Sequence, residues 1–334
     1  MDKGKVKASV LIVTLWVLAI LLLLAVGLAY RVGLDLHMTR YARDQMKAYY
    51  AAKAALAQAM VLLEEDSAST AVDTFQEAWS EAESLFKAGE VGDGVFSVYY
   101  TVTDEAGNES KRYGMQDEES RLPLNRVSAE VLQRVPGLEE DQAVAIRAWR
   151  GDKNFSPEQL VIEDHYYETL VTPYSRKGKP FETLEELLLV RGITPAHYEE
   201  FRQFFTVYGS GKVNLNTVSA EALVLMGLDP VLAQQISEAR KGEDGVLGSP
   251  DDFIFNSVPD LVSQKFGKLL RLDQDQQLAL VNFMSAYQEM LDVRSSAFRI
   301  QVEGRLKQNH IKKRILVVAD RSEVPSRIRY WHEN

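Results

Sequence analysis

The sequence predicts an α+β protein with a long N-terminal transmembrane helix, a small antiparallel sheet and a large all-α domain inserted between the strands. Three observations support this fold class. An uncharged apolar run fills residues 8–30. Segments rich in β-branched and aromatic residues, which favour strands, lie at residues 95–104 and again after residue 295. Between residues 122 and 290, apolar residues recur at helical spacing and are separated by Gly and Pro.

The apolar run from Ala8 to Tyr30 predicts a helix that crosses a membrane. Such a helix would be roughly 34 Å long, enough for the hydrocarbon core of a bilayer. Lys3, Lys5 and Lys7 precede it, which places the short N-terminus in the cytoplasm and the bulk of the chain outside. A removable signal peptide has a shorter apolar core and a small-residue cut site, whereas this run continues into helix-favouring sequence. We therefore expect a retained, single span.

Composition excludes several classes of protein. The chain has 334 residues, which leaves room for two domains after the anchor. Its net charge of −10 and isoelectric point near 5.2 disfavour a large nucleic-acid-binding face, which would be rich in Lys and Arg. The absence of cysteine excludes disulfides, thiolate nucleophiles and cysteine-ligated metal sites.

The sequence lacks the motifs of common enzymes. It contains no GxSxG, HExxH, Walker A or GxGxxG pattern. GSGK at residues 209–212 lacks the first Gly of a phosphate-binding loop and the hydroxyl residue after Lys. The histidines are scattered, without metal-ligand spacing, and we expect them at the surface: His37, His165, His197, His310 and His332. We therefore expect a protein that is not an enzyme.

The helix that starts in the membrane is expected to continue to about Glu65. No Gly follows Gly33 in this stretch, no Pro interrupts it, and residues 49–65 are rich in Ala and Leu. Apolar residues recur there at spacings of three and four, at Ala52, Leu56, Ala59, Met60 and Leu63. This face is predicted to pack on the chain's own domain, on similar helices in a bundle, or on both.

The α+β part is predicted to continue with a short helix and several strands. Residues 67–94 suggest a short amphipathic helix that carries Phe75, Trp79, Leu85 and Phe86, followed by a loop at residues 89–94. The predicted strands are residues 95–104, 110–115, 295–306, 314–319 and 328–331, with turns at residues 105–108 and 308–312.

The inserted domain, residues 121–290, contains an internal repeat. LNRVSAEVLQRVPGL begins at Leu124, and LNTVSAEALVLMGL begins at Leu215. Each copy predicts an N-cap, a helix, a Gly-containing turn and a second helix. The matched positions are Ser128 with Ser219, Glu130 with Glu221, Ala143 with Ala233, and Ile146 with Ile236. Tight turns are expected at Gly137, Gly192 and Gly227, and further short helical units at residues 180–193 and 249–262.

Two acidic groups are candidates for a metal site. Asp152, Glu163 and Asp164 lie in one segment, and EDGVLGSPDD occupies residues 243–252. Calcium takes about 6–8 oxygen ligands, which carboxylates in loops can supply. Neither group matches the EF-hand pattern, and from spacing alone each is more typical of a solvated loop.

Taken along its length, the chain resembles the minor pseudopilin K family of the type II secretion system, also called general secretion pathway protein K. The resemblance rests on the order and spacing of several segments. They are residues 9–29, 117–132, 145–152, 163–167, 180–193, 206–223, 293–304 and 330–331. It implies a pilin-like fold.

The resemblance also implies that prepilin peptidase cuts a short leader after Ala8 and methylates the new N-terminus at Ser9. The family usually has Gly before the cut, so Ala8 is a departure. A cut after Gly4 would leave Lys5 and Lys7 at the start of a membrane helix. The implied division is a leader at 1–8, a transmembrane part at 9–30, a pilin-like helix and first strands at 31–120, the helix-hairpin-helix or SAM-like insert at 121–290, and C-terminal strands at 291–334.

The family resemblance further implies a place at the tip of a filament. Most pilin-like subunits carry Glu at the fifth mature position, where this chain has Val13. A carboxylate in hydrocarbon needs a partner, so a subunit without it needs no neighbour ahead of it. The implied partners are the other minor pseudopilins I, J and H, the pseudopilus and prepilin peptidase, with Val13, Leu56 and Met60 in filament packing. The implied location is the inner membrane of a Gram-negative bacterium, with most of the chain in the periplasm.

Calcium is a known ligand of the family's globular part, so the resemblance implies a possible calcium site here. Its acidic positions match Asp152, Glu163 and Asp164, whereas Gly178 stands where the family has Asn.

The repeat also resembles the helix-hairpin-helix of membrane-anchored competence DNA receptors, which hold phosphates at Gly turns. Here LDP follows Gly227 and LEEDQ follows Gly137, and acidic residues at a turn repel phosphate. We therefore expect no nucleic-acid partner. A third possibility, a membrane-anchored hydrolase, has no motif in its favour.

Overall fold

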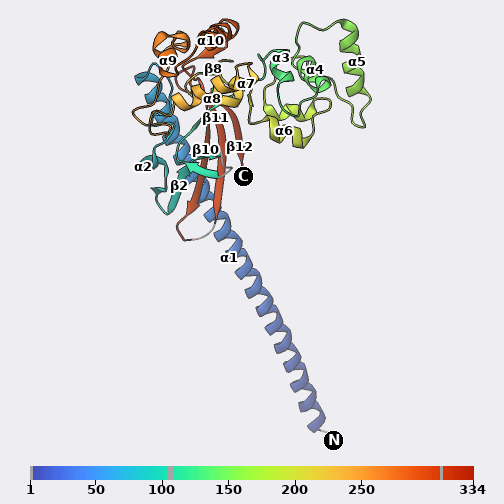
Figure 1. Cartoon of the computed structure of the whole chain (residues 1–334). Helices are drawn as coiled ribbons and strands as arrows, with labels where there is room; N and C mark the ends of the chain where they lie inside the picture. The colour runs from blue at the N-terminus through green and yellow to red at the C-terminus, as the bar shows by residue number, and fades with distance from the viewer. Residues whose placement is uncertain (1–2, 104–108, 309–310) are drawn as a thin grey trace.

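A computed structural model of the protein describes residues 3–103, 109–308 and 311–334, apart from the side chains of residues 3–9 and 103. The first two residues of the predicted leader, the predicted turn at 105–108 and residues 309–310 of the next predicted turn lie outside the described residues. The first element, α1 (Lys3–Ser69), is a single helix of 67 residues. Its N-terminal part stands free and its C-terminal part enters the globular region (Figure 1). The predicted long helix is therefore confirmed.

A six-stranded antiparallel sheet packs beside the end of α1. The strand order is β1-β2-β10-β11-β12, and β5 also pairs with β10. The strands are β1 (Gly89–Val91), β2 (Gly94–Val98), β5 (Gln116–Asp117), β10 (Ala297–Leu306), β11 (Lys312–Asp320) and β12 (Arg327–Glu333). The sheet thus combines strands from before and after the inserted domain, as the sequence predicts.

Close contact between backbones holds α1 on the sheet. The alanines on the inner face of α1 are 0% exposed: Ala48, Ala51, Ala52, Ala55 and Ala59. Opposite them, a Cβ added at Gly304 of β10 would lie 2.1 Å from the carbonyl oxygen of Ala48 and 2.4 Å from the amide nitrogen of Ala52. Only glycine therefore allows the helix to lie this near to β10.

Larger side chains close the core on both sides of this contact. Leu56 and Leu63 of α1 pack with one face of β10 and β11. The rings of Trp79 and Phe298 meet edge to face, with centroids 5.0 Å apart. This core confirms that the predicted inner face of α1 packs on its own domain.

The inserted domain is helical and has its own core. Its first half contains β6 (Leu122–Pro123), α3 (Ala129–Gln133), α4 (Glu140–Trp149), α5 (Pro157–Glu168), η2 (Leu184–Leu189), α6 (Pro195–Phe201) and β7 (Phe205–Thr206). Its second half contains β8 (Val213–Asn214), α7 (Ala220–Leu225), α8 (Pro230–Ala239), η3 (Val258–Val262), α9 (Gln264–Leu269), α10 (Gln274–Tyr287) and β9 (Leu291–Asp292). The short pairs β6–β7 and β8–β9 are parallel and each closes one half. The halves lie next to each other across the top of the molecule in Figure 1.

The two copies of the repeat fold alike. Ser128 accepts a hydrogen bond from the amide of Val131 at the start of α3, and Ser219 accepts one from Ala222 at the start of α7. The turns that follow contain Gly137 and Gly227, whose φ angles are +74° and +104°. The matched alanines and isoleucines of α4 and α8 are all buried. The predicted repeat is thus confirmed.

Several predicted elements between residues 67 and 115 are wrong in detail. The expected amphipathic helix shrinks to α2 (Glu83–Phe86), and the expected loop at residues 89–94 contains β1. The expected strand at 95–104 divides into β2 and β3 (Tyr100–Thr103), and β3 pairs with β4 (Glu109–Arg112) in a separate sheet. Long-range hydrogen bonds decide this path, because the amide of Met115 bonds to the carbonyl of Trp79 at 2.7 Å.

The helical unit predicted at residues 249–262 is shorter than expected, because only η3 is helical there.

Candidate assembly surfaces and predicted metal ligands

The exposed part of α1 is an apolar surface with no cover. The helix passes the length and hydropathy test for a membrane span, and its most apolar stretch is 0% buried. Beyond the predicted span, apolar side chains also remain exposed on the helix: Val32, Leu34, Leu36, Met38, Tyr41, Met46 and Tyr50. An apolar surface of this extent is typical of contact with a membrane or a partner chain.

The predicted filament-packing residues divide between two environments. Val13 is 58% exposed on the free part of α1. Leu56 is only 5% exposed because it packs on the sheet, so the prediction that it contacts a neighbouring subunit is corrected. Met60 is partly buried against the same core. Ala8 and Ser9 belong to α1, and their side chains lie outside the described ones.

A buried polar network joins α1, the sheet and the inserted domain, and we call it the junction network. At its centre is Asp117, which is fully enclosed. Its Oδ2 accepts hydrogen bonds from the hydroxyls of Thr217 (2.5 Å) and Ser295 (2.6 Å) and from Nδ2 of Asn214 (3.3 Å). Its Oδ1 accepts one from the amide of Glu119 (2.8 Å). Asp117 lies just before the insert and Ser295 just after it, so these hydrogen bonds join both ends of the insert to Asn214 and Thr217 within it.

The second half of the junction network centres on Arg321, whose side chain is 3% exposed. Its guanidinium pairs with Asp73, which follows α1, and with Oδ2 of Asp66 at 2.6 Å. It also lies 4.4 Å from the centre of the Phe298 ring. The carboxylate of Asp73 in turn accepts the amide of Ser295 at 2.6 Å. The end of α1 is therefore tied to the start of β10 and the end of β11.

Burial and neighbouring charges shift the pKa values of acids in and around the junction network in both directions. Burial, with the nearby charge of Glu119, raises the pKa of Asp117 to about 7. Burial also raises the pKa of Glu77 to about 7. Burial opposes ionisation of Glu118 as well, but the charges of Arg299 and Arg121 outweigh it and lower the pKa of that carboxyl. Sequence reasoning missed the role of this network, although Asp117 begins one of the segments that carry the family resemblance.

The structure does not gather the predicted calcium ligands into one site. Each carboxylate is paired with at least one arginine, and no two of them share an arginine. Asp152 binds Arg150 at 2.6 Å and Arg147 at 3.0 Å, Glu163 binds Arg191 at 2.5 Å, and Asp164 binds Arg176 at 2.9 Å. Burial opposes ionisation of Asp152, but its arginines outweigh burial and lower the pKa of the carboxyl. The ligand set does not fit calcium in this arrangement, because its oxygens already hold cationic side chains.

The second acidic group does come together. The carboxylates of Asp244, Asp251 and Asp252 lie within 4.8 Å of one another. Their oxygens accept bonds from the loop itself, such as the amide of Glu243 to Asp251 at 2.6 Å and the amide of Gly248 to Asp252 at 2.7 Å. These bonds account for the shape of the loop without a metal.

The glycine turns of the repeat are occupied by neighbouring side chains. A Cβ at Gly137 would lie 3.2 Å from a carboxylate oxygen of Glu200, and one at Gly227 would lie 3.0 Å from the guanidinium of Arg134. Arg134 also donates to the carbonyl of Leu225 at 3.2 Å. The first turn thus faces an acid, and the second packs against the first copy of the repeat. This geometry does not favour the DNA-binding alternative.

Three of the histidines have the predicted surface position: His37, His165 and His332. His197 is half-buried and stacks on Phe201, with ring centroids 5.7 Å apart. His310 lies outside the described residues.

Fold and surfaces define a class of protein: a pilin-like subunit with one candidate membrane-spanning helix and a helical insert. Comparisons with known proteins then show which family the chain resembles. Residues 108–210 match the family model described as "Type II secretion system (T2SS), protein K". The type II secretion system protein K of Aeromonas hydrophila is 24% identical over 305 residues, which cover 87% of this chain and 86% of that protein.

A solved structure agrees with these sequence matches. The crystal structure of the GspK-GspI-GspJ complex from enterotoxigenic Escherichia coli contains a chain that matches with a TM-score of 0.63 and 14% identity, over 89% of this chain and 99% of that one. This likeness establishes the fold. Together with the sequence matches, it confirms the predicted resemblance to the minor pseudopilin K family of the type II secretion system.

Proposed function

We propose that the protein occupies the tip of the type II secretion pseudopilus, where it starts and caps assembly with the minor pseudopilins I, J and H. This assembly would serve protein export across the outer membrane. The observation that carries the proposal is the position of the insert. The helices α3 to α6 extend far to one side of α1, above the sheet (Figure 1). A subunit stacked on top would meet this domain, so the chain suits the end of a filament.

The lower contacts would come from the uncovered face of α1. Met38 and Tyr41 are 63% and 57% exposed, although both are largely apolar. Burial of such side chains against helices of partner subunits would contribute about 25 cal/mol for each Å² of apolar surface removed from water. The Escherichia coli complex, in which the matching structure is found together with GspI and GspJ, supports partners of these two types. Val13 adds support. Because valine places no carboxylate in the membrane at this position, the chain needs no neighbouring subunit ahead of it to pair with one.

Processing and location follow from the same proposal. Prepilin peptidase would remove residues 1–8 and methylate Ser9, and the globular part would lie in the periplasm. Intact mass of the membrane-extracted protein, expressed with and without the peptidase, tests this. Loss of eight residues and gain of one methyl group, only with the peptidase, is the expected result. An uncut chain, or a cut by signal peptidase, would contradict it.

Calcium binding at Asp152, Glu163 and Asp164 stays a prediction from the family resemblance. In the arrangement described above, calcium would first have to displace an arginine from these carboxylates.

The partner contacts can be tested by cysteine cross-linking, because the natural chain contains no cysteine. Met38→Cys and Tyr41→Cys would each be paired with single cysteines in the N-terminal helices of I and J. Oxidation should give disulfide-linked heterodimers. The matched control is Ala55→Cys, since Ala55 is 0% exposed against the sheet and should not cross-link. Cross-linking of the control, or none from the exposed positions, would contradict this assignment of the assembly face.

A further inference from the structure

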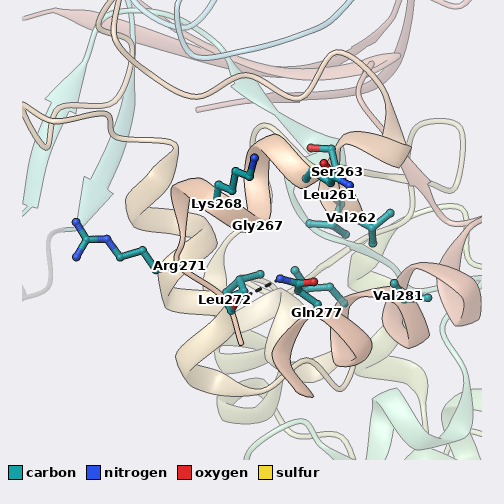
Figure 2. Close-up of a pocket in the computed structure, with 11 residues that line it drawn as sticks. Leu261, Val262, Ser263, Gly267, Lys268, Arg271, Leu272, Gln277 and Val281 are labelled. Atoms are coloured by element: carbon teal, nitrogen blue, oxygen red, sulfur yellow. Dashed lines mark hydrogen bonds between the residues drawn. The ribbon is translucent and has the colours of Figure 1, made fainter. Parts of the chain in front are cut away.

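A groove lies between η3, α9 and α10, at the end of the molecule opposite the free end of α1 (Figure 1), and Figure 2 shows the residues that line it. Its volume is about 680 Å³, within the range of sites that hold small ligands or short peptide segments. The lining residues Leu261, Leu272 and Leu280 belong to the domain core and are at most 9% exposed, so the exposed apolar surface of the groove comes mainly from Val281, which is 44% exposed. Neither the repeat nor the proposed assembly role involves this groove.

The charge of the groove is opposite to that of the chain. Lys268 and Arg271 line it, and none of its lining residues is acidic. The protein as a whole has a net charge of −10. Within the described part of the chain, neither cation forms an ion pair, and both are exposed. Figure 2 shows the Lys268 side chain extending toward Ser263, whereas Arg271 points outward at the rim. Unpaired cations beside the exposed side chain of Val281 favour an anionic, partly apolar ligand.

The apolar surface continues on the outer side of α10. Val281 lines the groove and is 44% exposed, and Leu278, one turn earlier, is 58% exposed. Residues three apart lie on the same face of a helix, so the two side chains form an apolar surface open to solvent. A ligand longer than the groove itself would therefore find further apolar contacts.

Glycine at position 267 keeps the groove open. Gly267 lies in α9, and a Cβ added there would meet only the Gln277 side chain, at 3.7 Å. That is an ordinary van der Waals separation, so alanine fits. A larger side chain would extend into the space between α9 and α10. Arg271 has φ +54°, a conformation that non-glycine residues rarely adopt, and thereby ends α9 at the rim of the groove.

We propose that this groove binds a peptide segment of another protein in which apolar side chains alternate with carboxylates. Apolar residues would contact Val281 and Leu278, and a carboxylate would pair with Lys268. Helical and extended segments both bind grooves through such anchors. A second copy of this chain suits the site less, because a symmetric contact would bring Lys268 and Arg271 of both copies together.

Two pairs of matched variants separate this role from a structural one. Gly267→Leu fills the groove, whereas Gly267→Ala leaves it open. Lys268→Glu reverses the charge in the groove. Lys265→Glu makes the same change on the same short helix, but Lys265 lies over the Phe253 ring at 5.4 Å, outside the groove. Circular dichroism and thermal unfolding would confirm that all four variants fold.

The experiment measures fluorescence anisotropy of a labelled peptide of three Leu-Glu repeats with the full chain in detergent. We expect saturable binding that weakens with salt, a loss of about fivefold or more in Lys268→Glu, and none detectable in Gly267→Leu. Gly267→Ala should bind as the natural chain does, and Lys265→Glu nearly so. Equal binding of a Leu-Lys peptide, or equal effects of the two lysine variants, would overturn the proposal. The proposal would also be overturned if the natural chain bound no peptide but formed concentration-dependent dimers that Gly267→Leu abolishes.

Discussion

Substitution of Gly304 by Ala tests how α1 is seated on the sheet. The added methyl carbon would lie 2.1 Å from the carbonyl oxygen of Ala48 and 2.4 Å from the amide nitrogen of Ala52. Favourable contacts between such atoms lie near 3.5 Å, so α1 would have to move off β10 by about 1 Å. Both atoms belong to the backbone of a long helix, so neither can turn aside as a side chain would.

The size of the effect follows from this geometry. Overpacking of a well-filled core costs about 1–3 kcal/mol, and contacts with a rigid backbone belong at the upper end. For a domain of this size, 3 kcal/mol lowers the melting temperature by about 6–12 °C. Thermal unfolding of the full chain in detergent, followed by circular dichroism, gives the measurement.

The matched control is Gly33→Ala in the same helix. A Cβ at Gly33 meets no atom within 4 Å, and alanine favours helix over glycine. We expect no loss of stability in this variant. If Gly304→Ala melted within about 1 °C of the natural chain, the close helix–sheet contact and the reasoning built on it would be refuted.

Three further predictions concern the junction network and the predicted metal ligands. The pKa of Asp117 is raised to about 7 from 3.8, so its contribution to the free energy of unfolding is full below about pH 4 and is lost as pH rises through 7, by up to about 4 kcal/mol. Asp117→Asn should therefore reduce the fall in melting temperature between pH 5 and pH 8. An unchanged pH profile in this variant would contradict the assignment. Arg321→Ala leaves Asp66 and Asp73 buried without their cation and should lower the free energy of chemical unfolding by about 3–5 kcal/mol. The control Arg327→Ala removes an exposed pair with Glu323 and should lower it by less than about 1 kcal/mol. Similar losses in both variants would show that the buried pair stabilises the fold no more than the exposed one. Removal of calcium with a chelator should leave the melting temperature unchanged if the arginine pairs of Asp152, Glu163 and Asp164 persist; a fall that Asp152→Asn abolishes would instead support the calcium site implied by the family.

Local patterns predicted the parts of the fold that local forces determine. The anchor, the continuous helix and the caps at Ser128 and Ser219 each depend on residues within a few positions of one another. Strand β10 was also predicted correctly, since its apolar residues alternate along the sequence. These elements agree with the structure to within a few residues.

The segment from residue 70 to 115 was less predictable because distant contacts decide it. Trp79 and Phe86 have helix-like spacing, yet each is buried by a separate turn of the chain against the sheet. The hydrogen bond from the amide of Met115 to the carbonyl of Trp79 fixes the path of this segment, and no local sequence pattern predicts that bond.

The junction network was hidden from sequence reasoning for the same reason. Asp117, Thr217 and Arg321 are far apart in the chain, and nothing near any of them indicates that it will be buried. By contrast, the short distances in sequence between Asp152, Glu163 and Asp164 suggested a metal site, but each carboxylate is paired with arginine instead.

The central claim, that the protein caps a filament, is tested most directly by its position on one. A single tag at an exposed residue of the insert, such as Val171, would be labelled with gold on isolated pseudopili and viewed by electron microscopy. If the protein caps the filament, each filament carries one label, at one end. Labels distributed along the filament length would contradict it.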